Sequence, residues 1–183
     1  MRVLIVGPPG AGKGTQAAVL SKELGVPHIS TGDLFREHVG DETELGRLVK
    51  EYLESGKLVP DRVTNEMVRE RLTDEDCTDG FLLDGFPRTV PQAKVLADML
   101  RERNCELDVV LQLDVPEDVV VARLLARGRE DDSVDVIRHR QQVYQEETAP
   151  LLGFYADRLV TVPAVGSIDD VTARALVALR GQA

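Results

Sequence analysis

A short apolar run followed at once by a glycine-rich turn constrains the fold of this chain more than any other feature. Residues 3–6 read Val-Leu-Ile-Val, and residues 7–15 read Gly-Pro-Pro-Gly-Ala-Gly-Lys-Gly-Thr. A buried β-strand that enters such a turn and then a helix binds anions, because glycines let backbone N–H groups converge and the helix start adds a positive dipole. Lys13 adds a mobile positive charge, which a turn that is glycine-rich by chance does not explain. The pattern predicts a loop that holds the β- and γ-phosphates of a nucleotide.

Short apolar runs alternate with longer segments of helical periodicity along the whole chain. This alternation predicts an α/β fold with a parallel sheet covered by helices on both faces. The predicted strands cover residues 3–6, 27–29, 81–83, 108–114 and 158–162. The predicted helices cover residues 12–24, 32–39, 44–55, 63–72, 90–103, 116–126, 134–156 and 168–179. Gly25 and Gly56 are expected to end the first and third of these helices.

Length and composition indicate one soluble globular domain over residues 1–183. Hydrophobic residues make up 43% and charged residues 30%, and no run approaches the roughly 18 apolar residues of a membrane-spanning helix. The net charge of −10 argues against nucleic acid or an anionic membrane as a partner. Because an apolar strand follows Met1-Arg2 directly, we expect no targeting segment and a cytoplasmic location. No exposed apolar stripe stands out, so we expect a monomer.

The two cysteines predict neither a disulfide nor a metal site. Cys77 and Cys105 stand far apart, with no C-x-x-C pair and no histidine at ligand spacing. We therefore expect reduced thiols and no zinc.

A second phosphate-binding element is predicted directly after the strand at residues 81–83. Asp84 stands at the carboxyl end of that strand, where an acidic side chain can orient hydrated Mg²⁺ beside a phosphate loop. Gly85 and Pro87 make a stiff turn that aims Arg88, whose planar fork can hold a phosphate at two points. The alternative is that Asp84 caps a helix and Arg88 is a surface charge.

Further cationic residues follow other predicted strands. Arg36 lies on the first turns of a helix that follows a strand, and Thr31 either contacts a ligand or serves as the N-cap of that helix. Arg123 and Arg127 lie at i and i+4 on one helix face, where like charges repel unless an anion relieves them. Such a pattern is also found on solvated helix faces.

Taken together, these elements resemble the nucleoside monophosphate kinases, and the adenylate kinases most closely. The resemblance rests on Gly-Pro-Pro-Gly-Ala-Gly-Lys-Gly-Thr-Gln at 7–16, Ser-Thr-Gly-Asp-Leu-Phe-Arg at 30–36, Asp-Gly-Phe-Pro-Arg at 84–88, Arg-Gly-Arg at 127–129 and Thr-Ala-Pro-Leu-Leu at 148–152. The motifs occur in family order and span the chain.

The resemblance implies a three-layer P-loop kinase core with a five-stranded parallel sheet and two small lobes. A monophosphate-binding lobe is expected at residues 30–59, inserted in the core, and a short lid at 126–132 with flanks to about 137. The lid carries no cysteine set, so it resembles the short form without zinc. Closure of the lobes would exclude water, with Gly32, Gly56 and Gly128 as hinge candidates.

The resemblance also implies the reaction ATP + AMP ⇌ 2 ADP with Mg²⁺, and hence a role in adenine nucleotide homeostasis. A kinase for UMP or CMP is the alternative within enzymes, and a non-catalytic ATP-binding module is the alternative outside them. His28, His38 and His139 need not be catalytic, because the acceptor phosphate is already anionic and requires no general base.

The expected site residues follow from the family motifs. ATP is expected to contact Gly10, Ala11, Gly12, Lys13, Gly14, Thr15, Arg123, Arg127 and Gly166. AMP is expected to contact Thr31, Arg36, Lys57, Leu58, Val59, Gly85, Phe86, Pro87, Arg88, Gln92, Arg129 and Arg140, with Thr31 and Gln92 favouring adenine. Charge neutralisation during transfer is assigned to Lys13, Arg88, Arg123, Arg129 and Arg140. Since Gly14 stands where most phosphate loops carry Ser or Thr, Mg²⁺ is expected to be held through water by Asp84.

Overall fold

A parallel sheet forms the centre of the protein. The computed structural model describes residues 1–128 and 133–181, and in these residues five strands lie in the order β2-β3-β1-β4-β5. All four neighbouring pairs are parallel, which confirms the predicted sheet. The strands are β1 (Arg2–Val6), β2 (His28–Ser30), β3 (Phe81–Asp84), β4 (Val109–Asp114) and β5 (Leu159–Pro163).

The helices agree with the predicted segments to within about two residues at most ends. They are α1 (Lys13–Leu24), α2 (Thr31–Gly40), α3 (Glu44–Ser55), α4 (Asp61–Leu72), α5 (Val90–Glu102), α6 (Glu117–Arg127), α7 (Val134–Val143), α8 (Pro150–Phe154) and α9 (Ile168–Arg180). Short 3₁₀ turns at Glu75–Cys77 and Ala156–Arg158 were not predicted. Among the described helices, none is long and apolar enough to cross a membrane.

The prediction of one continuous helix over residues 134–156 is wrong. Regular α-helix ends at Val143, and a wider π turn covers Tyr144–Thr148 before α8 begins at Pro150. Proline has no N–H, and its ring clashes with the carbonyl four residues earlier, so it cannot continue the preceding turn. The N–H of Ala149 instead donates to the carbonyl of Tyr144 at 2.8 Å, which closes the wide turn.

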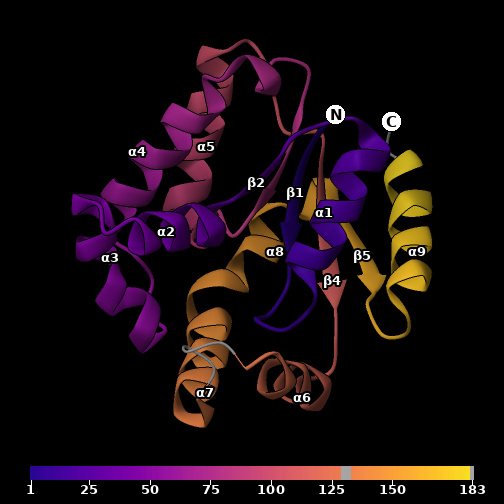
Figure 1. Cartoon of the computed structure of the whole chain (residues 1–183). Helices are drawn as coiled ribbons and strands as arrows, with labels where there is room; N and C mark the ends of the chain where they lie inside the picture. Colours follow the sequence, from indigo (N-terminus) through magenta and orange to yellow (C-terminus); the bar gives the residue numbers. More distant parts are fainter. Residues whose placement is uncertain (129–132, 182–183) are drawn as a thin grey trace.

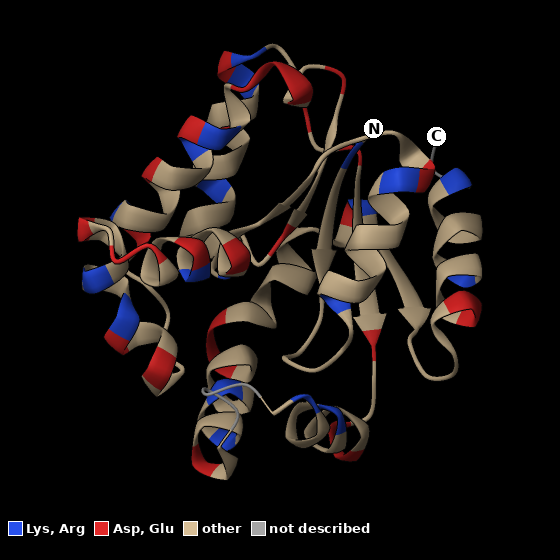
Figure 2. Cartoon of the chain, in the orientation of Figure 1, with Lys and Arg blue, Asp and Glu red and all other residues tan. Residues whose placement is uncertain are grey.

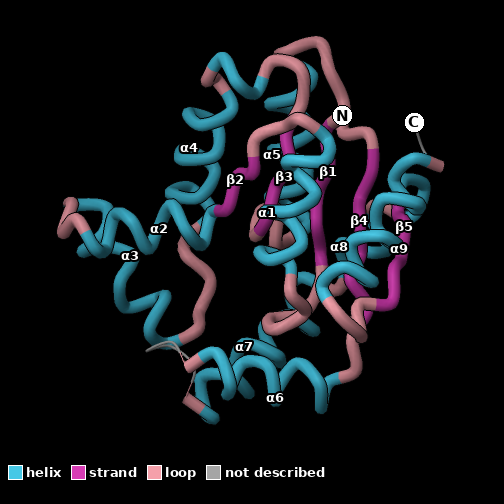
Figure 3. The backbone as a smooth tube through the Cα atoms, turned by 45° about the vertical axis from the view of Figure 1, so that its right-hand side comes forward, coloured by secondary structure: helices cyan, strands magenta, loops and turns pink. Residues whose placement is uncertain are grey.

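Each face of the sheet carries its own apolar layer, because successive strand side chains point to opposite sides. Val3 and Ile5 face α1 and α9, whereas Leu4 and Val6 face α4, α5 and α8. Figures 1 and 3 show the sheet between these two helical layers. The three-layer core expected from the sequence is therefore present.

The helix pair α2 and α3 projects from one side of the core and has a small core of its own. Phe35, Val49 and Val59 are buried there, at 4%, 0% and 7% exposure. Gly46 lets the two helices meet, since a Cβ at this position would lie 2.0 Å from the His38 carbonyl oxygen. The lobe is thus held together by its own apolar contacts (Figure 1).

Glycines end two helices as predicted. Gly25 after α1 and Gly56 after α3 adopt φ values of 66° and 74°, a left-handed conformation that side chains with a Cβ disfavour. The two cysteines are free thiols, with Cys77 buried and Cys105 half-buried.

Candidate active site

The sheet brings the phosphate loop and Asp84 to the same edge. Ile5 is in register with Asp84 of β3 and with Leu111 of β4, so the carboxyl ends of these strands lie side by side. The loop that follows β1 therefore stands directly beside Asp84, where parallel α/β sheets bind their ligands. A cavity of about 820 Å³ opens at this edge and is lined by residues from both elements.

The phosphate loop adopts a shape that only glycine permits at two positions. Gly10 and Gly12 have φ values of 88° and 92°. A Cβ on Gly10 would also lie 2.6 Å from the carbonyl oxygen of Val120 in α6, so the loop packs directly on that helix. These backbone angles turn the loop around the start of α1, as the sequence predicts.

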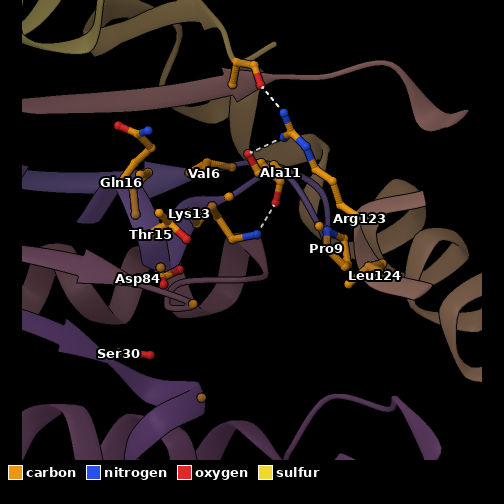
Figure 4. Close-up of a pocket in the computed structure, with 18 of the residues that line it drawn as sticks. Val6, Pro9, Ala11, Lys13, Thr15, Gln16, Ser30, Asp84, Arg123 and Leu124 are labelled. Atoms are coloured by element: carbon orange, nitrogen blue, oxygen red, sulfur yellow. Dashed lines mark hydrogen bonds between the residues drawn. The ribbon is translucent and has the colours of Figure 1, made fainter. Parts of the chain in front are cut away.

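Lys13 lies within the curve of the loop (Figure 4). Its Nζ donates hydrogen bonds to the carbonyl oxygens of Gly7 at 2.7 Å and Pro8 at 3.0 Å. Burial lowers the pKa of Lys13 to about 8; Asp84 opposes this change, and nearby arginines such as Arg88 add to it. The cavity therefore carries an excess of positive charge, which an anionic ligand would neutralise.

Asp84 is suited to hold a hydrated cation. The residue is only 8% exposed, and among the described residues no hydrogen-bond donor contacts its carboxylate oxygens. The Nε2 atom of His28 lies 3.8 Å from Oδ2, beyond hydrogen-bond distance, and is itself buried without a partner. Carboxylate oxygen is a preferred ligand of Mg²⁺, which keeps several waters when it binds proteins. No group of three or more metal-ligating side chains occurs in the described part of the chain.

Arg88 connects the large cavity with a smaller pocket of about 60 Å³. Its Nε donates to the Gly85 carbonyl oxygen at 2.8 Å. The Arg88 side chain is exposed to the cavity but lies deep inside the protein. Loss of bulk water therefore lowers the pKa of Arg88 below its ordinary value. Asp84 opposes this change, whereas Arg140 and Arg36 add to it. The alternative that Arg88 is an ordinary surface charge does not fit this position.

Most of the residues expected to hold AMP surround the smaller pocket. Its lining includes Thr31, Arg36, Lys57, Leu58, Val59, Gly85, Arg88, Gln92 and Arg140. Pro87 lines the larger cavity instead, and Phe86 is fully buried in the core and lines neither. The pocket adjoins the α2–α3 pair, which contributes Phe35, Arg36 and Leu53.

The interpretation of Thr31 as a helix cap is wrong. Ser30 caps α2, since its Oγ accepts from the N–H of Asp33 at 3.2 Å. Thr31 is the first residue of the helix and is 2% exposed, with its hydroxyl 3.5 Å from the Asp84 carbonyl oxygen. The strand therefore extends one residue further than predicted and shifts the cap to the preceding serine.

Gln92 is fixed by two short hydrogen bonds. Its Oε1 accepts from the N–H of Arg88 at 2.7 Å, and its Nε2 donates to Oδ1 of Asp61 at 2.7 Å. Sequence reasoning missed Asp61, because an acidic residue at a helix start is usually explained by the helix dipole alone. Gln92 keeps one N–H and one lone pair for a ligand.

The cationic residues of α6 and α7 converge on the same cavity. Arg123 donates from Nη1 to the Ala11 carbonyl at 3.3 Å and from Nη2 to the Ala164 carbonyl at 3.0 Å, bridging two loops (Figure 4). Arg127 and Arg140 also line the cavity. Arg129 lies outside the described residues. Figure 2 shows basic segments at the start of α1 and on α6 and α7.

An unpredicted contact fixes α7 to the phosphate loop. Nε2 of Gln141, which is 9% exposed, donates to the Pro9 carbonyl oxygen at 2.9 Å. A glutamine in a helix gives no sequence signal of such a long-range bond.

Comparison with known proteins gives a uniform result. A family model described as adenylate kinase matches residues 5–160. The chain is 55% identical to the adenylate kinase of Rhodococcus erythropolis and 58% identical to those of Corynebacterium diphtheriae and Nocardia farcinica. Each match extends over 179 residues, 98% of this chain and 99% of the relative. Because both the family model and relatives of more than half identity extend over most of its length, the chain belongs to the adenylate kinase family.

Proposed function

We propose that the two connected cavities bind ATP and AMP and that the terminal phosphoryl group of ATP passes to AMP, giving two ADP. Family membership makes the chain a nucleoside monophosphate kinase, which is a phosphotransferase. The relatives are named adenylate kinases, so a preference for UMP or CMP is not favoured. The observation that supports the proposal most is the position of Arg88, which lines both cavities beside Asp84.

The larger cavity is proposed as the ATP site and the smaller pocket as the AMP site. The backbone N–H groups from Gly10 to Thr15 would surround the ATP phosphates, with Arg123, Arg127 and Gly166 completing that site. The AMP site would consist of Thr31, Arg36, Lys57–Val59, Gly85–Arg88, Gln92, Arg129 and Arg140. The α2–α3 pair, within residues 30–59, is the proposed AMP-binding lobe. The proposed lid at 126–132 falls largely outside the described residues.

Repulsion between two polyanions is the main obstacle to this reaction. The acceptor phosphate carries about 1.5 to 2 negative charges at pH 7, so it attacks without a general base. Lys13 and Arg88 would neutralise the transferring group, together with Arg123, Arg129 and Arg140. Mg²⁺, held through water by Asp84, would supply further positive charge at the phosphate oxygens. Charge neutralisation of this kind has its largest effect in a cavity closed to water.

We also propose that the protein acts as a cytoplasmic monomer. The net charge of −10 disfavours contact with nucleic acid or anionic lipid, and the exposed large apolar side chains of the described residues are spread over several elements, among them Leu48 of α3, Leu125 of α6 and Val177 of α9. Light scattering coupled to size exclusion tests the oligomeric state, and a dimer mass would overturn it.

The proposed reaction is tested with purified protein, Mg²⁺ and ATP, incubated in parallel with AMP, CMP, UMP or no acceptor. We expect ADP to accumulate at two molecules per AMP consumed, and little change with the other acceptors. Comparable turnover with CMP or UMP would overturn the specificity, and tight ATP binding without turnover would overturn the reaction.

A further inference from the structure

The loop between β5 and α9 forms one wall of the larger cavity. Ala164, Gly166, Ser167 and Ile168 line it, opposite the phosphate loop. Gly166 has no side chain, so it offers the cavity only backbone groups, and their position depends on what holds the loop in place.

Arg174 of α9 holds most of this loop. Its Nη2 donates to the Val165 carbonyl oxygen at 2.6 Å, its Nη1 donates to the Pro163 carbonyl oxygen, and its Nε donates to the Asp170 carbonyl oxygen at 3.0 Å. A guanidinium that spans three carbonyls fixes their relative orientation, since its donors form a rigid planar fork.

Further hydrogen bonds hold both ends of the loop. The N–H of Ala164 donates to the Asp114 carbonyl at 2.8 Å, and its carbonyl accepts from Arg123. Ser167 and Asp170 form a capping box that closes the loop onto the start of α9. Gly166 packs against Arg174, since a Cβ there would lie 3.3 Å from Nη2.

These bonds leave a defined set of polar groups for a ligand. Within the described residues, neither the carbonyl nor the N–H of Gly166, which lines the cavity, has a hydrogen-bond partner. One acceptor next to one donor matches the amino group and ring nitrogen on the edge of adenine. Guanine presents a carbonyl oxygen and an N–H at those positions, so it would place like groups together.

We propose that Arg174 is a positioning residue that selects adenine over guanine in the phosphoryl donor, by occupying the Pro163 and Val165 carbonyls and fixing Gly166. The inference rests on the proposed function only in taking the larger cavity as the ATP site. Without the guanidinium, the Pro163 and Val165 carbonyls become available as acceptors, and the loop loses its fixed orientation. Adenine and guanine would then both find hydrogen-bond partners.

The experiment compares Arg174→Met with Arg180→Met, which removes the same charge from an exposed position on the same helix. Binding of ATP and of GTP, each with Mg²⁺ and without AMP, is measured by isothermal titration calorimetry. We expect Arg174→Met to weaken ATP binding about tenfold and GTP binding much less, so that the ratio of the two affinities falls about tenfold. Arg180→Met should leave the ratio unchanged, and Arg174→Lys, which keeps some donors, should restore part of it.

Equal losses for ATP and GTP, which leave the affinity ratio unchanged, would overturn the proposal, because they would indicate a merely structural role for Arg174. Melting temperatures of the variants, measured without ligand, identify any loss due to unfolding. Since AMP is absent, the result is independent of turnover: a protein that binds ATP selectively but makes no ADP contradicts the proposed reaction and leaves this inference standing.

Discussion

At the scale of single residues, the site contains positive charges that are buried away from water and that a bound anion would neutralise. Lys13 shows this most directly, since its hydrogen-bond partners within the described residues are two backbone carbonyls of its own loop. Burial away from water lowers the pKa of Lys13 to about 8. Carbonyl dipoles compensate a buried ammonium less well than phosphate oxygens do. Phosphate binding should reverse this change.

The first prediction is that ATP binding takes up a proton at alkaline pH. With a pKa of about 8 in the free protein, about nine tenths of Lys13 is neutral at pH 9, and bound phosphates should restore its proton. ATP affinity should therefore fall as pH rises through 8. Calorimetry at pH 9 in two buffers of different ionisation enthalpy measures the uptake. Lys13→Met should abolish most of it, and equal uptake in that variant would assign the proton to another group.

The second prediction concerns Lys13 and Arg88, two cations that line the larger cavity together with Asp84. Lys13→Ala or Arg88→Ala should each lower kcat at least about a hundredfold, because each removes a transition-state charge contact of about 3 kcal/mol. Lys94→Ala, an exposed lysine of α5, serves as the control and should leave kcat unchanged. Near-normal turnover in either site variant would refute the role assigned to that residue.

The third prediction is that a substitution at Gln92 affects AMP binding but not ATP binding. Gln92→Ala should raise KM for AMP about tenfold with KM for ATP nearly unchanged, since Gln92 lines only the smaller pocket. Asp61→Ala, which removes the acceptor that orients the Gln92 amide, should produce the same change in weaker form. Steady-state kinetics with each nucleotide varied in turn test both. An equal rise in the two KM values would refute a role confined to AMP.

At the scale of elements, strands and helix ends were largely predictable from the sequence, whereas breaks within a helix were not. The run at residues 3–6 and the glycines at 25 and 56 carry local signals strong enough to set their own conformation. The break before Pro150 depends on a π turn closed by Ala149 and Tyr144, which periodicity does not reveal. Long-range bonds such as Gln141 to Pro9 are set by the packing of distant segments, so no local pattern predicts them.

The end of α3 supports a fourth prediction, because it touches α7. A Cβ on Gly56 would lie 3.0 Å from Cγ of Arg140 and 3.2 Å from Cγ1 of Val136. Gly56→Ala should therefore lower kcat, by displacing the α2–α3 pair or Arg140, as well as stability.

Gly25→Ala is the matched control for that variant. Gly25 has a similar φ of 66°, but an added Cβ would meet nothing within 4 Å. Both variants should lose about 1 kcal/mol of unfolding free energy from left-handed strain, measured by urea denaturation. Only Gly56→Ala should reduce kcat; a similar reduction in Gly25→Ala would attribute the effect to strain alone.

At the scale of the whole molecule, a protein of net charge −10 has a cavity at which basic residues outnumber acidic ones. Its described lining holds six cations, Lys13, Arg36, Arg88, Arg123, Arg127 and Arg140, against Asp33 and Asp84. Acidic and basic segments are both spread over the outer helices in Figure 2, and basic segments of α1, α6 and α7 stand beside the phosphate loop. The sequence allowed the cavity to be predicted, because Lys13, Arg36 and Arg88 lie in local motifs that follow strands. It did not reveal which cations approach one another, since that depends on how α6 and α7 pack on the core.

The fifth prediction follows from this separation of charge. If the local field of the cavity governs ATP binding, added salt should weaken it despite the like net charge of protein and ligand, because salt screens the nearby arginines. Raising KCl from about 20 to about 300 mM should lower ATP affinity about tenfold, as measured by calorimetry at pH 7. Adenosine, which has the same base without phosphates, is the matched control and should bind with nearly constant affinity. If salt instead strengthens ATP binding, the net charge of the molecule outweighs the cavity, and the charge-neutralising roles assigned to its arginines must be abandoned.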